Sequence, residues 1–139
     1  MGNIVYNIAR EKLASGQLDL ATVDLWLMLT YGYVPSVNGH TYVSDASSYE
    51  VTGNGYTRKQ LENVTLTRDT VNNRMVLRAD ELAWSLANFT ADGAILYVDT
   101  GSDSTSYLIT FLDFGEDKQS QNTQFKVVWS DAEGIINLR

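Results

Sequence analysis

The C-terminal stretch from residue 94 to residue 138 constrains the fold more than any other part of the sequence. It divides into runs that are rich in aromatic and β-branched residues and are separated by turn residues. Four strands are predicted, at residues 94–99, 106–113, 124–130 and 135–138. The second run is largely apolar on both alternating faces, so we expect a central strand that is covered on both sides. A turn is predicted at residues 100–103, and a long polar loop is predicted to begin at residues 115–118.

Residues 22–30 give the clearest strand of the N-terminal half. Leucines line one of its alternating faces, and Trp26 lies on the opposite face. Residues 61–67 and 74–79 predict a hairpin. Shorter elements complete the pattern: strands at 49–51 and 82–84, a bulge or positive-φ turn at 53–55, the hairpin loop at 69–73 and a turn at 88–93.

About eight short strands, with turn signals roughly every 8–12 residues, predict a mainly β protein. We expect an antiparallel β-sandwich; a barrel belongs to the same class, and a jelly-roll-like topology is one way to connect the strands. The chain has 139 residues, which suits one domain, and no repeat or linker divides it. We therefore predict a single β-sandwich domain over residues 1–139, with a short N-terminal α-helix in a helical segment at residues 1–16.

The N-terminal helix is predicted at residues 4–14, with Asn3 as its N-cap. Ile4, Val5 and Ile8 contribute to a narrow apolar stripe along it. This is more apolar surface than a solitary short helix leaves exposed, and so short a helix is marginal alone. We therefore expect the helix to dock, either on its own sandwich or across a subunit boundary.

The irregular stretch at residues 31–48 is the longest connection, and such loops often carry binding. It includes a predicted helical turn at residues 41–46. Trp26, opposite the leucine face of its strand, offers a second apolar surface for an opposing sheet or a subunit contact. The predicted interface residues are Ile4, Val5, Ile8, Trp26, Tyr31 and Tyr33.

Composition argues against several classes of protein. The net charge is −7, from 17 acidic and 10 basic residues, which disfavours contact with a nucleic-acid backbone. The sequence has no cysteine, so it forms no disulfide and no zinc–thiolate site. The N-terminus lacks the pattern of a secretory signal, and the longest apolar run, residues 25–29, is far too short to cross a bilayer. We therefore predict no nucleic-acid partner and no membrane partner.

The residues that carry catalysis in other proteins have simpler explanations here. His40 is the only histidine and lies in a predicted turn, as a loop histidine does. Adjacent acids at 80–81 and 116–117 are candidates for a two-carboxylate hydrolase, but solvated turn charges explain them more simply. Residues 99–103 resemble part of a calcium loop without the later bidentate Glu, so an inter-strand turn is favoured. We predict no catalytic, cofactor-binding or metal-binding residues, no cofactor and no enzymatic activity.

Several segments of the chain look familiar when they are taken in order. They are 53–58 (GNGYTR) after Glu50-Val51, 79–84 (ADELAW) followed by 88–91 (NFTA), 94–97 (AILY) near 112–115 (LDFG), and 128–130 (VWS) with 134–136 (GII). Together they resemble a family of small structural proteins encoded by tailed bacteriophages. The ordered set covers nearly the whole chain.

This resemblance implies a structural role in the virion, without catalysis. Some small β-rich virion proteins of this size are capsid decoration (cement) proteins, often trimeric, which bind and stabilise the capsid exterior. We therefore expect a decoration protein whose partners are the major capsid protein or other virion proteins, a homo-oligomer with a trimer favoured, and a location in the virion after assembly in the host cytoplasm. The alternative is a neck, tail or fibre-base protein, including a receptor- or glycan-binding module, which the aromatic content and the loop at 31–48 favour.

Overall fold

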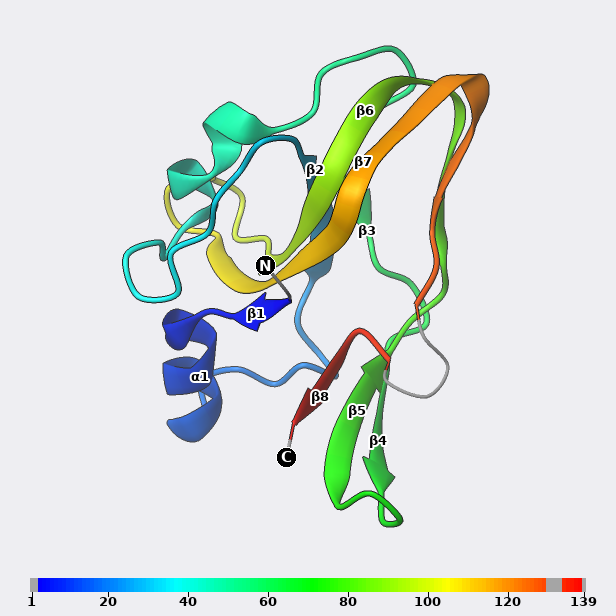
Figure 1. The fold of residues 1–139 in the computed structure, drawn as a ribbon. Coiled ribbons are helices and arrows are strands. Elements are labelled where there is room, and N and C mark those ends of the chain that lie inside the picture. The colour runs from blue at the N-terminus through cyan, green and yellow to red at the C-terminus, as the bar shows by residue number, and fades with distance from the viewer. Residues whose placement is uncertain (1–2, 130–133, 139) are drawn as a thin grey trace.

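The structure is a computed structural model that describes residues 3–129 and 134–138. Within these residues the chain is mainly β, with antiparallel sheets and one short α-helix (Figure 1), which confirms the predicted class and fits a β-sandwich. The elements in chain order are β1 (Ile4–Val5), α1 (Asn7–Ala14), β2 (Leu25–Thr30), the 3₁₀ turns η1 (Val43–Asp45) and η2 (Ser47–Tyr49), β3 (Lys59–Gln60), β4 (Thr65–Asp69), β5 (Arg74–Arg78), β6 (Leu82–Val98), β7 (Tyr107–Val127) and β8 (Ile136–Leu138).

Two sheets are present in the described residues. The larger sheet has the order β1-β7-β6-β2-β3, and the smaller one has the order β4-β5-β8. The predicted hairpin of residues 61–79 is confirmed as β4 and β5, with Leu66 opposite Leu77. Neither strand order is the Greek key from which a jelly roll is built.

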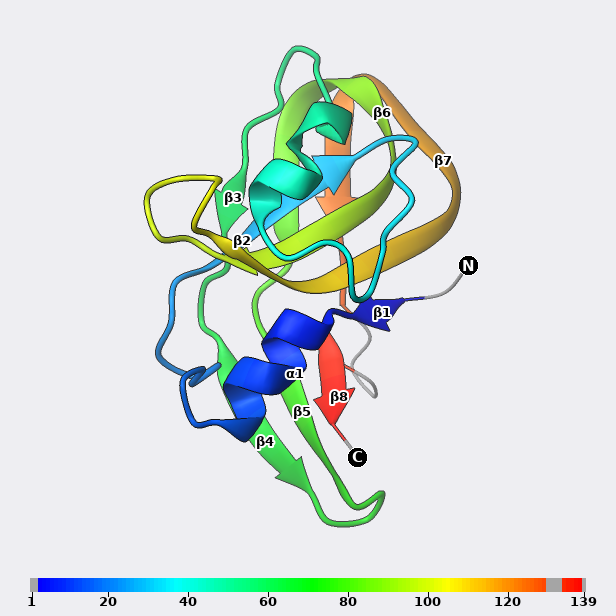
Figure 2. The same cartoon turned by 90° about the vertical axis from the view of Figure 1, so that its left-hand side faces the viewer.

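The dominant element is the hairpin of β6 and β7, which bends into an arch in both views (Figure 1, Figure 2). The pairing shifts at the bend, because Ala91 lies opposite Lys118 whereas Gly93 lies opposite Asp113. Residues 114–117 are thus an irregular insertion in β7, and such insertions bend a strand.

Two sequence predictions are wrong in this hairpin. The turn expected at 88–93 lies inside β6, and the polar loop expected after residue 115 lies inside β7. The two stretches pair with each other, for example Phe89 with Ser120. Only one face of this part of the arch is buried: Phe89 is 5% exposed, whereas residues 121–124 are exposed. Polar side chains therefore occupy the solvent face of a strand that sequence reasoning took for a loop.

The larger sheet is buried on both faces around β2 and the turn-proximal part of β7. Residues 108–112 are all buried, which confirms the expected central strand. On β2, Leu27 packs in the main core with Trp84, whereas Met28 packs on the opposite side with Tyr6. The predicted alternation of residues 22–30 is correct, although the strand itself begins at Leu25.

The N-terminal segment differs from its prediction at the first turn. Ile4 and Val5 are not helical but form β1, which pairs with Phe111 and Thr110 of β7. The side chain of Asn3 does not cap the helix; its Oδ1 accepts a hydrogen bond from the backbone N–H of Asp113. The backbone N–H and C=O groups at the edge of β7 therefore pair with residues 4–5, which the apolar pattern of the sequence had assigned to the helix.

The connection at residues 31–48 and the residues after it contain short 3₁₀ turns. The helical turn expected at 41–46 is confirmed by η1, where the Asp45 carboxylate accepts the backbone N–H groups of Thr41 and Tyr42, which lower the pKa of Asp45. The strand expected at 49–51 is wrong, because Tyr49 ends η2 and pairing is limited to one bridge between Thr30 and Glu50.

Candidate functional site

Four surface grooves border the β6–β7 hairpin near its bend. The largest, about 490 Å³, runs along the edge of β7, and its walls come from residues 114–128. A second, the acidic groove (about 320 Å³), is lined by Tyr33, Phe111, Gly115 and four carboxylate residues, Asp92, Asp113, Glu116 and Asp117. The other two are the tyrosine groove (about 410 Å³), lined by Tyr31, Ser48, Tyr49, Glu50, Val51, Thr52, Phe89 and Thr90, and the amide groove (about 380 Å³), lined by Asn88, Phe89, Thr90, Gln119, Ser120, Gln121 and Asn122.

The tyrosine groove has two exposed aromatic side chains in its walls. Tyr31 is 48% exposed and Tyr49 is 45% exposed. The Tyr31 N–H donates to the Tyr49 carbonyl oxygen at 2.9 Å, and the Tyr49 ring lies 5.7 Å from the ring of the buried Tyr33. The backbone hydrogen bond thus holds the two segments that carry these side chains next to each other.

The acidic groove holds the start of the 31–48 connection against the bend. The Gly32 N–H donates to both carboxylate oxygens of Asp92, at 3.1 and 3.2 Å. The Tyr31 hydroxyl donates to Asp117 Oδ2 at 3.2 Å, and this hydrogen bond raises the pKa of Tyr31. Asp92 and Asp117 therefore line the acidic groove and also hold Tyr31 in the wall of the tyrosine groove.

The amide groove lies on the solvent face of the arch. The side chains of Asn88 and Asn122 bridge the two strands, since Asn88 Nδ2 donates to Asn122 Oδ1 at 2.8 Å. Asn122 has a φ of 54° and stands between the pairs Asn88–Gln121 and Ala87–Thr123, as the extra residue of a bulge. The bulge bends β7 and interrupts its edge, which is one way in which proteins prevent unwanted strand pairing.

Tyr33, a predicted interface residue, is 5% exposed and belongs to a chain of buried hydrogen bonds. Its hydroxyl lies 2.9 Å from the Tyr6 hydroxyl and 2.7 Å from His40 Nδ1. Burial raises the pKa of Tyr6 and of Tyr33 above the ordinary value. The only histidine thus stacks on Tyr33 and fixes the loop.

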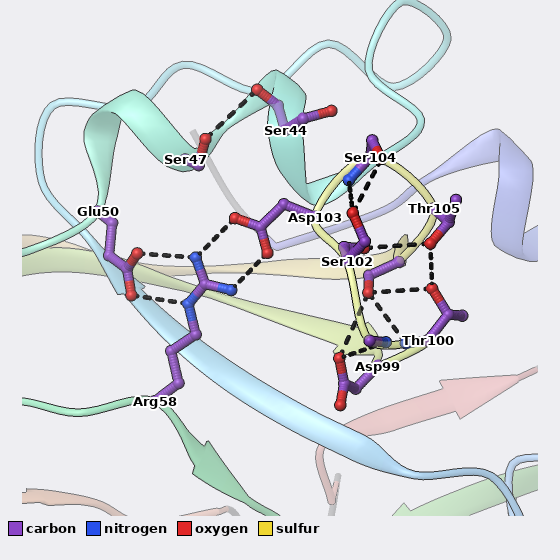
Figure 3. A network of polar contacts seen from close by, with 12 residues as sticks. Ser44, Ser47, Glu50, Arg58, Asp99, Thr100, Ser102, Asp103, Ser104 and Thr105 are labelled. Carbon is purple, nitrogen blue, oxygen red and sulfur yellow. Dashed lines mark hydrogen bonds and ion pairs between the residues drawn. The ribbon is translucent and has the colours of Figure 1, made fainter.

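Arg58 connects two loops near the turn of the hairpin: its own connection between η2 and β3, and the turn between β6 and β7 (Figure 3). Its guanidinium binds Glu50 through two hydrogen bonds of 2.8 Å and Asp103 through two of 2.7 and 3.0 Å. The hydrogen bonds from Arg58 lower the pKa of Asp103. Paired, bidentate geometry of this kind is the strong form of a charge-assisted hydrogen bond.

The stretch that resembled a calcium loop serves as the turn between β6 and β7. Its Asp103 is bound to Arg58, and its Asp99 accepts the Gly101 N–H at 3.1 Å. Within residues 3–129 and 134–138, no group of three or more His, Cys, Asp or Glu side chains is placed to hold a metal ion.

The adjacent acids have separate partners. Asp80 accepts a hydrogen bond from Asn63, and Glu81 pairs with Lys126 at 3.0 Å. Glu116 pairs with Lys118, whereas Asp117 accepts the Tyr31 hydroxyl. Each acid is thus engaged in a local structural contact.

The remaining predicted interface residues are Ile4, Val5, Ile8 and Trp26. Ile4, Ile8 and Trp26 are partly buried and pack against the second core cluster, which contains Tyr6 and Met28. Val5 packs against the main core. Each of them keeps some exposed surface, and contact with another chain stays a prediction for this set.

Sequence reasoning missed Tyr49, Thr90, Gln119 and Gln121 as candidate binding residues. The available signal was the neutral polar run at residues 119–124, which lies between two charged lysines and continues a strand. Tyr49 gave no such signal, because Tyr31 becomes its neighbour only through the fold.

Comparison of the chain with protein-family models, with curated proteins and with solved structures found no match. In the part of the chain that the structure describes, no helix combines the length and the apolar character needed to cross a membrane.

Proposed function

We propose that this protein is a non-enzymatic structural component of a tailed-bacteriophage virion that decorates the capsid by binding the exterior of the major capsid protein lattice. The proposal originates in the resemblance of the sequence to small virion proteins. One observation supports it: segments that carry the resemblance come together in space. Asn54 bridges to Asn88, and Ala94 pairs with Leu112, so these segments meet around the β6–β7 hairpin.

The surface proposed for attachment is the N-terminal end of the molecule. Ile4, Val5 and Ile8 lie there, on β1 and α1, partly exposed and packed on a β framework. Figure 1 shows β1 and α1 side by side at this end of the molecule. A rigid framework with apolar side chains suits repeated docking on a lattice, because little is ordered on binding. A homotrimer is the proposed oligomer, and Trp26 is the next contact candidate.

Copy number in purified particles tests the location. The protein should be present in a fixed, high ratio to the major capsid protein on quantitative gels. A few copies per particle would reject decoration and favour the neck, tail or fibre base.

A substitution in full-length protein tests the surface. Ile8→Glu should reduce attachment to particles that lack the protein, and should lower the sedimenting mass if the trimer uses this face. Val71→Glu is the control, because Val71 is 87% exposed in the β4–β5 loop. Equal attachment of both variants would exclude the N-terminal end as the contact.

A further inference from the structure

Two of the grooves at the bend adjoin and share their chemical character. The tyrosine groove and the amide groove both have Phe89 and Thr90 of β6 in their walls, so they adjoin at these residues; the two grooves together are called the path below. Among the described residues that line this path, Glu50 carries the only carboxylate or amine, and it is paired with Arg58. The path is therefore polar but nearly neutral.

The polar side chains along the path are available to a ligand. Those of Ser48, Thr90, Gln119 and Gln121 make no hydrogen bond to another described residue. Each glutamine amide offers donors and an acceptor in one planar group, and each hydroxyl both donates and accepts. The path can thus hydrogen-bond to groups that themselves donate and accept.

The aromatic end of the path is preorganised. Tyr31 and Tyr49 are joined through a backbone hydrogen bond, Tyr31 is held by Asp117, and Tyr49 rests on Tyr33. Little rotamer freedom remains to be lost when a ligand covers these rings.

We propose that this path binds a neutral oligosaccharide. A sugar ring presents an apolar C–H face and a rim of hydroxyl groups, which match the rings of Tyr31 and Tyr49 and the side chains of Thr90, Gln119 and Gln121. Sulfated, phosphorylated and carboxylated glycans are repelled by the adjoining acidic groove and by the net charge of −7. The path shares no residue with the N-terminal surface proposed for attachment, so it would let a decorated particle adhere to a glycan-coated surface.

The first test is an array of neutral linear oligosaccharides of glucose, mannose and N-acetylglucosamine, printed beside sialylated and sulfated glycans. Purified full-length protein should bind one or more neutral glycans and no anionic one. Titrating the best neutral glycan into nitrogen-labelled protein should shift the backbone NMR signals of residues 48–52, 88–90 and 119–122.

Substitutions locate the site. Tyr49→Ser should weaken binding about tenfold, as expected for the loss of an aromatic stacking contact. Gln121→Ala should weaken it about threefold to tenfold, the effect of one hydrogen bond. Tyr42→Ser is the matched control, because Tyr42 is 40% exposed and lines neither groove.

The proposal is overturned if no neutral glycan binds, if anionic glycans bind better, or if Tyr42→Ser weakens binding as much as Tyr49→Ser. Thermal unfolding checks each variant; if Tyr49→Ser fails to fold, Gln121→Ala and the NMR map decide. The assay uses isolated protein, so its result and the result of the particle experiments are independent.

Discussion

The two halves of the β6–β7 hairpin are built from the same pair of strands but stand in different surroundings. In the half next to the turn, residues 93–98 pair with 107–113, and β2 and β1 extend the sheet on either side. In the half beyond the bend, residues 82–91 pair with 118–127; β2 and β1 end before it, and residues 121–124 are exposed. Both halves contribute residues to the main core, but the second half also offers a solvent face to a partner.

The largest expected difference comes from one substitution made in both halves. Leu96 is 0% exposed near the turn, and Leu82 is 7% exposed beyond the bend. Leu96→Ala should lower the free energy of unfolding by about 3–5 kcal/mol, and Leu82→Ala by about 2–3 kcal/mol, because a less enclosed site relaxes more easily. Chemical denaturation of both variants measures the two values. Equal losses would remove the energetic distinction between the halves.

The second prediction concerns the bend that separates them. A Cβ on Gly93 would lie 2.6 Å from the ring of Phe111, so Gly93→Ala should cost about 1–3 kcal/mol through overpacking. Shortening the opposing side chain should recover part of this loss, so the double variant with Phe111→Leu should be less destabilised than the sum of the single variants. Thermal or chemical unfolding measures the three variants. If the losses of the two single variants simply add, the close approach of position 93 to the Phe111 ring is not the cause of the cost.

The third prediction tests how firmly the turn end is held. Arg58→Met should cost about 1–2 kcal/mol, a value kept low because the Asp103 side chain is 41% exposed. The pKa of Asp103 is lowered from 3.8 in the folded protein, so its stabilisation is present above about pH 4 and is lost as the pH falls through the folded pKa. The variant should therefore lose less stability on acidification than the natural protein does. Arg68→Met on β4 is the control, and an identical acid dependence in all three proteins would contradict this account.

The smallest expected difference involves a hydroxyl in each half. Thr110 is buried and donates a hydrogen bond to the Ile4 carbonyl oxygen, whereas Thr123 is exposed. Thr110→Val should cost about 1 kcal/mol, and Thr123→Val less than about 0.5 kcal/mol. Unfolding midpoints of the two variants measure this. A larger loss at Thr123 would mean that the solvent face contributes to stability.

The difference between the two halves of the hairpin also explains which strands could be predicted from the sequence and which could not. Residues 106–113 were recognised as a strand because both faces are apolar, and the hairpin of β4 and β5 was recognised from alternation across a loop. Residues 115–124 were missed because glycine and polar side chains also characterise loops, and only the pairing with residues 87–91 makes them a strand. The β-sandwich class was therefore predictable, but the arch was not.

The candidate binding surface was less predictable than the fold. Tyr31 was singled out from its loop, but its contacts with Tyr49 and Asp117 link segments 18 and 86 positions apart. The ion pair of Arg58 was not predicted either: Glu50 lies 8 positions away without a helical spacing, and Asp103 lies 45 positions away and becomes a neighbour only through the fold. Side chains that meet through long-range pairing leave no periodic trace in a single sequence.

The position of β1 also has a consequence for the order of events during translation. The hydrogen bond from the Thr110 hydroxyl to the Ile4 carbonyl oxygen joins residues 106 positions apart. The backbone N–H of Tyr6 donates to the Ile109 carbonyl oxygen. Because β1 precedes β7 in the chain, it leaves the ribosome well before its partner strand has been synthesised, whereas β6 and β7 are neighbours in sequence. Local pairing precedes long-range closure because closing a long loop costs more chain entropy. We therefore expect β1, although made before its partner strand, to be the last strand to join the larger sheet.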